Sequence, residues 1–121
     1  MKKNFDKHIC IGDTVQFKRD GHEFVARIDY DEDSKPSDVD CYDAAQTKAW
    51  QNDEWRFAGV VVMPVCHCCG CPLRDRAHSV WAVEINLPGA SAECAKHCDE
   101  LAREMADTLL NEHTQGATWH R

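Results

Sequence analysis

The chain has 121 residues and a mass of 13.8 kDa, which suits one domain and leaves no room for two large ones. Its 21 acidic and 14 basic residues give a formal net charge of −7, and 43% of the residues are hydrophobic, so a wholly disordered acidic chain is excluded. Nothing in the sequence forms a basic stripe, which disfavours direct binding to nucleic acid or to an anionic membrane.

The N-terminal segment from Met1 to Cys10 is charged and lacks an apolar core of the length that a signal peptide needs. No apolar run approaches the ~20 residues of a membrane span. We therefore expect a single domain over 1–121, with flexible ends at 1–12 and 114–121, and a cytoplasmic protein whose eight cysteines are free or metal-bound rather than paired in disulfides.

The first half of the chain predicts a hairpin, a loop and a short helix. Alternating apolar residues on both sides of Asp20-Gly21 predict two antiparallel strands within 14–30, because Asp-Gly suits a type I′ turn. The acidic stretch 31–41 has no periodicity and is expected to be a loop. Asp43, with Gln46 three residues later, forms a capping box that predicts a helix over 44–52, with Ala45, Ala49 and Trp50 on its inner face.

The second half predicts a second hairpin and a longer helix. The β-branched run 57–65 and the imperfectly alternating run 79–86 are both typical of strands. Ser91 then begins a helix whose apolar residues recur every three or four positions, and Gly116 is expected to close that segment. The order is β-β-α-β-β-α, which predicts an α+β fold with an antiparallel sheet of about four strands and two helices packed on one face.

The negative charge is concentrated in one part of the chain. The 26 residues from Asp29 to Glu54 hold nine acids against Lys35 and Lys48, so this window has a net charge of −7 and the remainder is neutral. Trp50 and Trp55 lie within or beside it, whereas Trp81 and Phe57 are expected to be core residues. Exposed tryptophan beside fixed charge is typical of a protein–protein contact. The candidate partner-binding residues are Asp29, Asp31, Glu32, Asp33, Asp38, Asp40, Asp43, Asp53, Glu54 and Trp55.

The cysteines suggest a structural zinc site. Cys66-x-x-Cys69-Gly70 has the spacing of a zinc knuckle, and Cys94 and Cys98 are four residues apart on one face of the last helix. One candidate ligand set is therefore Cys66, Cys69, Cys94 and Cys98, and a second uses Cys68, Cys71, Cys94 and His97. The alternative is that the helical pair consists of small core residues, because cysteine is among the most frequently buried residue types. Zinc is the cofactor that the cysteine spacing suggests, and no cofactor is required by the sequence.

Two other kinds of site receive less support. Asp29-x-Asp31-x-Asp33 partly imitates a calcium-binding EF-hand loop, but Ser34 stands where the turn needs glycine and a strand leads into it. Seven histidines are scattered, and no nucleophile motif or glycine-rich phosphate loop is present. We therefore expect a protein that is not an enzyme, with a reactive thiol as the remote alternative.

Several aromatic and acidic positions between about Ile28 and Met105 carry a resemblance. They are Asp40-Cys41-Tyr42, Trp50, Asp53-Glu54-Trp55, Gly59-Val60-Val61-Val62 and Ser79-Val80-Trp81-Ala82-Val83-Glu84. This pattern resembles a group of small phage, prophage and mobile-element proteins, for which no catalytic residues are assigned. The chain departs from that group at 66–71, where an ordinary hairpin turn is usual.

The resemblance implies a setting in which small acidic proteins bind host or element proteins, and anti-CRISPR proteins are one such class. Together with the charge distribution, it predicts a non-catalytic protein whose acidic segment engages a basic surface of a protein partner, imitating the phosphates of nucleic acid. The alternative is a zinc-stabilised structural module with a solvated acidic loop.

Overall fold

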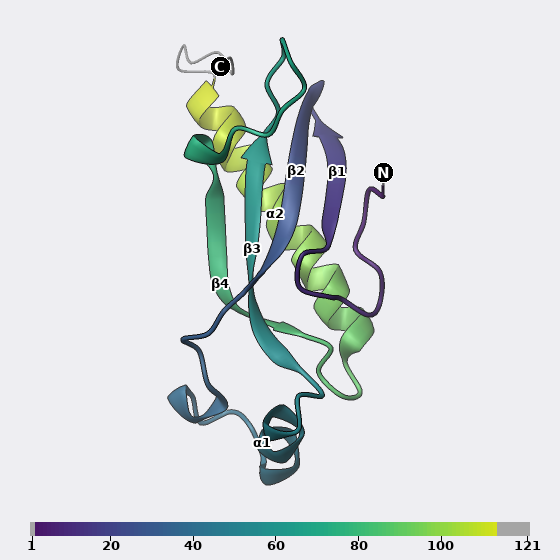
Figure 1. The fold of residues 1–121 in the computed structure, drawn as a ribbon, viewed down its shortest axis with the longest axis vertical. Helices are drawn as coiled ribbons and strands as arrows, with labels where there is room; N and C mark the ends of the chain where they lie inside the picture. The colour runs from purple at the N-terminus through teal and green to yellow at the C-terminus, as the bar shows by residue number, and fades with distance from the viewer. Residues whose placement is uncertain (1, 114–121) are drawn as a thin grey trace.

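Four antiparallel strands form one sheet in the order β1-β2-β3-β4, and a long helix crosses one face of it (Figure 1). The computed structural model describes residues 2–113. Its elements are β1 (Thr14–Arg19), β2 (His22–Tyr30), the 3₁₀ helix η1 (Pro36–Asp38), α1 (Ala44–Gln51), β3 (Arg56–Pro64), the 3₁₀ helix η2 (Arg74–Arg76), β4 (His78–Ile85) and α2 (Ser91–His113). The α+β class, the four-stranded antiparallel sheet and the two α-helices are as predicted, and the two 3₁₀ helices were not predicted.

The first hairpin turns where the sequence predicts it. Arg19 pairs with His22, and the two residues between them, Asp20 and Gly21, have φ values of 50° and 79°. Both values lie in the left-handed region that a type I′ turn requires, which glycine adopts without strain and aspartate tolerates.

The main core lies between the sheet and α2. Side chains alternate between the two faces of a strand, so Phe24, Ala26 and Ile28 of β2 point to the same face and are fully buried. Cys98 and Leu109 of α2 join them in one apolar cluster. Burying each large side chain of this kind stabilises the fold by roughly 1.5–3 kcal/mol. The predicted apolar stripe of the last helix is therefore what holds it to the sheet.

The position of α1 differs from the prediction that both helices pack on one face of the sheet. α1 lies beyond one end of the sheet (Figure 1), where Ala49 shares an apolar cluster with Cys94 in the first turn of α2. The Asp43–Gln46 capping box begins it as predicted, with the backbone N–H of Gln46 donating to Asp43 Oδ1 at 2.7 Å. Ala49 is buried, but the predicted inner residue Ala45 is exposed, because a helix of two turns buries only a narrow stripe.

The segment before β1, where the sequence predicts a flexible end, contributes two side chains to the core. Phe5 and Ile9 are buried in the main core. The side chain of Asn86 fixes Ile9 by accepting from its backbone N–H at 2.8 Å and donating to its carbonyl oxygen at 2.7 Å. Buried side chains and hydrogen bonds to Asn86 and Asp99 together anchor this segment, which composition alone does not reveal.

Two further expectations concern the C-terminal end and membrane spans. The predicted flexible end at 114–121 and the role of Gly116 lie outside the described residues. Among the residues that the structure describes, no helix is both long and apolar enough to cross a membrane.

Candidate binding surface

The acidic loop is tied to the sheet by the carboxylate of Asp31. After β2 the chain passes across the front of β3, on the face opposite α2 (Figure 1). One oxygen of Asp31 accepts from the backbone N–H groups of Asp33 and Ser34 at 3.0 and 3.1 Å. The other accepts from the Ser34 hydroxyl and from the backbone N–H of Ala82 in β4, both at 2.8 Å. A single carboxylate therefore joins the loop to a strand 51 residues away in sequence.

The strand that Asp31 reaches is irregular at this point. The β3–β4 register shifts between Ala58 and Val60, and Ala82 has a φ of 60°, which is unusual for a residue with a side chain. The intervening residue of β3 is Gly59, on which the indole of Trp81 lies. A Cβ atom placed at Gly59 would come within 2.4 Å of that ring. Glycine is therefore required here by close packing.

Burial and hydrogen bonding act in opposite directions on the pKa of Asp31. Burial favours the neutral acid and would raise the pKa. Hydrogen bonds from Ser34, Ala82 and Asp33 favour the carboxylate, and together they lower the pKa below its usual value. Asp31 is therefore a fixed negative charge beneath the loop at neutral pH.

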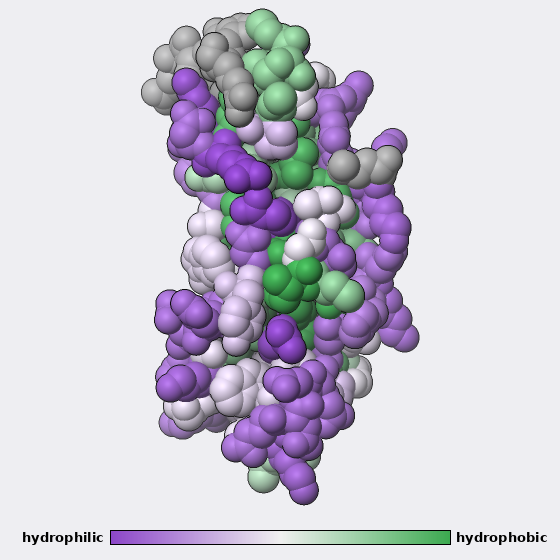
Figure 2. Space-filling view, viewed as in Figure 1, coloured by the Kyte–Doolittle hydropathy of each residue, from purple (hydrophilic) through white to green (hydrophobic). Residues whose placement is uncertain are grey.

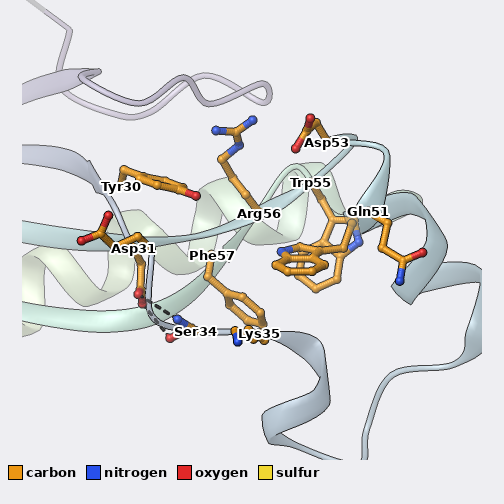
Figure 3. A pocket seen from close by; sticks show the side chains of 11 residues that line it. Tyr30, Asp31, Ser34, Lys35, Gln51, Asp53, Trp55, Arg56 and Phe57 are labelled. Carbon is orange, nitrogen blue, oxygen red and sulfur yellow. Dashed lines mark hydrogen bonds between the residues drawn. The ribbon is translucent and has the colours of Figure 1, made fainter.

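Two hollows flank the loop. The first, of about 390 Å³, lies between the loop, α1 and the start of β3 (Figure 3). Its lining includes Lys35, Trp50, Asp53, Arg56 and Phe57. The second, of about 570 Å³, lies between the loop and β4 and is lined by Tyr30, Asp31, Glu32, Asp33, Ser34 and Trp81. The loop is therefore a ridge with a depression on each side.

Most of the predicted partner-binding acids lie on the surface. The exposed ones are Glu32, Asp33, Asp38, Asp40, Asp43, Asp53 and Glu54. Asp43 also caps α1, and the partly buried Asp29 forms a two-point ion pair with Arg27, at 2.6 and 3.0 Å. Asp31, by contrast, is only 7% exposed, and its carboxylate already accepts four hydrogen bonds from the loop and β4.

The predicted contact residue Trp55 is also buried, at 1% exposure. Its indole N–H donates to the carbonyl oxygen of Gln46 at 2.8 Å, and its ring packs against Tyr42 and Phe57 with centroids 5.2 Å away from each. Tyr42 in turn donates its hydroxyl to the Glu84 carboxylate. Burial and this hydrogen bond both raise the pKa of Tyr42. Trp55 therefore attaches α1 to the end of the sheet, and its ring is not on the surface where the sequence places a partner contact.

The aromatic residues that are exposed were not predicted. Trp81, expected in the core, is 48% exposed, and Tyr30 is 55% exposed. Both line the second hollow. The imperfect alternation of apolar and polar residues around Trp81 is the feature of the sequence that could have predicted its exposure, because a bulge moves the following side chains to the other face of the sheet.

The predicted four-cysteine zinc site is not assembled. Cys94 contributes to the apolar cluster around Trp55 and Phe57, and Cys98 to the main core, both in the first turns of α2. The turn that carries Cys66 and Cys69 lies at the opposite end of the sheet, beside the end of α2 (Figure 1). Cys68, Cys71 and His97 are separated in the same way. Within residues 2–113 no three histidine, cysteine or acidic side chains converge to hold a metal ion.

The helical cysteines behave as core residues. Burial raises the pKa of Cys94, and it raises that of Cys98 to about 12, so both thiols stay neutral at physiological pH. The spacing of four residues that suggests metal ligands also produces the apolar stripe of an amphipathic helix, and here packing accounts for it.

No protein-family model matches the chain, and neither the curated proteins nor the solved structures contain a significant match.

Proposed function

We propose that the protein is a non-catalytic binding protein whose acidic loop and α1 engage a basic surface of a partner protein. The observation that carries this proposal is the exposure of seven carboxylates on one continuous stretch of chain between β2 and β3. Hydrophilic residues dominate the end of the molecule that carries this stretch (Figure 2). A surface on which one sign of charge predominates raises the rate of encounter with a partner of opposite charge.

Hydrogen bonds hold both ends of the loop in place, which favours binding. Asp31 fixes its start, η1 follows it, and the Asp43 capping box fixes the beginning of α1. Carboxylates that are already positioned lose less conformational entropy on binding than those on a disordered tail. The arrangement suits competition with nucleic acid for a channel rich in lysine and arginine.

The proposal includes a biological setting. The aromatic and acidic pattern resembles proteins of phages and mobile elements, which supports a role in inhibiting a host nucleic-acid-binding or defence complex. This part of the proposal rests on the resemblance alone.

Affinity capture tests the proposal. The tagged protein, its Glu32→Gln/Asp33→Asn variant and the control variant Glu100→Gln/Glu104→Gln would be incubated with a lysate of the host. The control removes two exposed carboxylates from α2 and none from the loop. We expect a basic protein that is captured by the wild type and the control, is lost with the loop variant, and is released by double-stranded DNA.

Asp31 stays unchanged in these variants because its carboxylate maintains the loop itself. Equal recovery by all three proteins would contradict the proposal, as would recovery that double-stranded DNA leaves unchanged.

A further inference from the structure

The second hollow carries negative charge and aromatic surface but no cation of its own. Three of its six lining residues are acids, two are aromatic, one is serine and none is basic. The first hollow, on the other side of the loop, includes Lys35 and Arg56 among its lining residues. Of these two hollows, the second is therefore the one whose lining has no cation to repel a positively charged ligand.

Two large aromatic side chains are half-exposed in this hollow. Tyr30 is 55% exposed and Trp81 is 48% exposed, and the position of Trp81 is set by its contact with Gly59. Aromatic rings left at the surface in a depression are typical of binding sites, since their contact area is large and their rotamer entropy is low. The indole N–H of Trp81 donates to the Ser79 hydroxyl at 3.1 Å, which further orients the ring.

One of these two rings already contacts a guanidinium group of the same chain. The guanidinium carbon of Arg56 lies over the Tyr30 ring, 5.8 Å from its centroid. Arg56 lines the first hollow and not the second. Tyr30 lines both hollows, so the same side chain that contacts the Arg56 guanidinium also contributes to the second hollow.

We propose that the second hollow binds an arginine side chain of the basic partner, with its guanidinium against Tyr30 and Trp81 and its N–H groups donating to Glu32 and Asp33. This inference rests on the proposed function and identifies the partner group that the surface recognises. Arginine fits better than lysine because its planar group stacks on aromatic rings and donates to a carboxylate at two points, whereas an ammonium is compact and strongly hydrated. The ionised Asp31 beneath the loop adds to the attraction.

The experiment uses the full chain and two blocked peptides, triarginine and trilysine, which have the same charge. Binding would be followed at low ionic strength by two-dimensional ¹H–¹⁵N NMR, in which each tryptophan indole gives its own signal. We expect triarginine to bind about threefold more tightly than trilysine and to shift the Trp81 indole signal, assigned from the Trp81→Phe spectrum. An exposed cation–π contact of ~0.5–1 kcal/mol corresponds to such a factor.

Variants at Tyr30 separate aromatic recognition from simple charge attraction. Tyr30→Leu should reduce the preference for triarginine over trilysine, because only Trp81 then remains to stack on the guanidinium, and Tyr30→Leu/Trp81→Leu should abolish it. Tyr30→Phe retains the ring and should retain the preference. Asp53→Asn, which removes a carboxylate of the first hollow, should leave the preference unchanged. Equal affinity of the wild type for the two peptides, or a preference that the double leucine variant retains, would overturn the assignment.

Lysate capture with a Tyr30→Leu/Trp81→Leu variant distinguishes this inference from the proposed function. Capture that requires Glu32 and Asp33 but persists in the double leucine variant would leave the proposed function standing and refute the arginine site. If the protein prefers triarginine as expected but the Glu32→Gln/Asp33→Asn variant captures the partner as well as the wild type does, the arginine site stands and the proposed function fails.

Discussion

Asp31 shows how one side chain can set the shape of a surface. Its carboxylate accepts four hydrogen bonds, from both the loop and β4. Asp31→Asn keeps the size of the side chain but replaces one acceptor oxygen with a donor, which would face an N–H or hydroxyl group. We expect a loss of about 1–3 kcal/mol in the free energy of unfolding, measured by urea denaturation.

The same residue predicts a dependence on pH. Because the pKa of Asp31 is lower in the folded protein than in the unfolded chain, its stabilising effect is complete above the ordinary pKa of 3.8 and is lost as the pH falls through the folded value. The stability difference between wild type and Asp31→Asn should therefore be constant near neutral pH and shrink below about pH 4. A difference that does not change with acidification would contradict this account.

The packing of Trp81 on Gly59 can be tested directly, because the indole occupies the space that a Cβ atom at Gly59 would need. Gly59→Ala should cost about 1–3 kcal/mol in the wild type, since the ring must move or the strands must separate. In a Trp81→Ala background the same substitution should cost close to nothing. A double-mutant cycle by chemical denaturation measures the coupling, and additive effects would show that the two residues do not compete for space.

At the scale of elements, the segment before β1 makes the clearest prediction, because it carries no regular structure and yet contributes to the core. Ile9 is 1% exposed, whereas Ile11, two residues later, is 40% exposed. Ile9→Ala should lower the free energy of unfolding by about 2–5 kcal/mol, and the matched Ile11→Ala should change it by less than about 0.5 kcal/mol. Thermal and urea denaturation of both variants checks this, and similar effects from the two would mean that the segment is not anchored as described.

The whole molecule separates its charge from its core. The main apolar core lies between the sheet and α2, while the exposed acids between β2 and β3 lie at one end. The location of the charge, rather than its total, should then govern how fast a basic partner associates.

Two triple variants test this. Glu32→Gln/Asp33→Asn/Asp53→Asn and Asp75→Asn/Glu100→Gln/Glu104→Gln each remove three carboxylates, so each changes the net charge from −7 to −4. With the partner recovered by capture, we expect the first triple to reduce the association rate about tenfold at low salt and the second less than about twofold. Stopped-flow or surface-based kinetics at several salt concentrations would measure this. Equal reductions would show that net charge alone governs the rate.

The sequence by itself determined the elements whose signals are local. The Asp20-Gly21 turn requires positive φ at adjacent residues, the Asp43–Gln46 box satisfies its own helix terminus, and the stripe of α2 follows from a 3.6-residue period. Each depends on residues within a few positions of one another. The concentration of acids in one window is likewise a property of the sequence alone.

Only the tertiary structure decided which of those residues are on the surface. Asp31 is buried where its carboxylate accepts a hydrogen bond from the backbone N–H of Ala82 in β4. Trp55 is buried where its ring packs against Tyr42 and Phe57 at the end of the sheet. Trp81 is exposed because the register of β4 shifts opposite Gly59, which a single-strand pattern does not encode. The two cysteine pairs lie at opposite ends of the sheet for a similar reason. The spacing of two cysteines along the chain determines whether their side chains share one face of an element, but the distance between one pair and the other depends on how the elements pack.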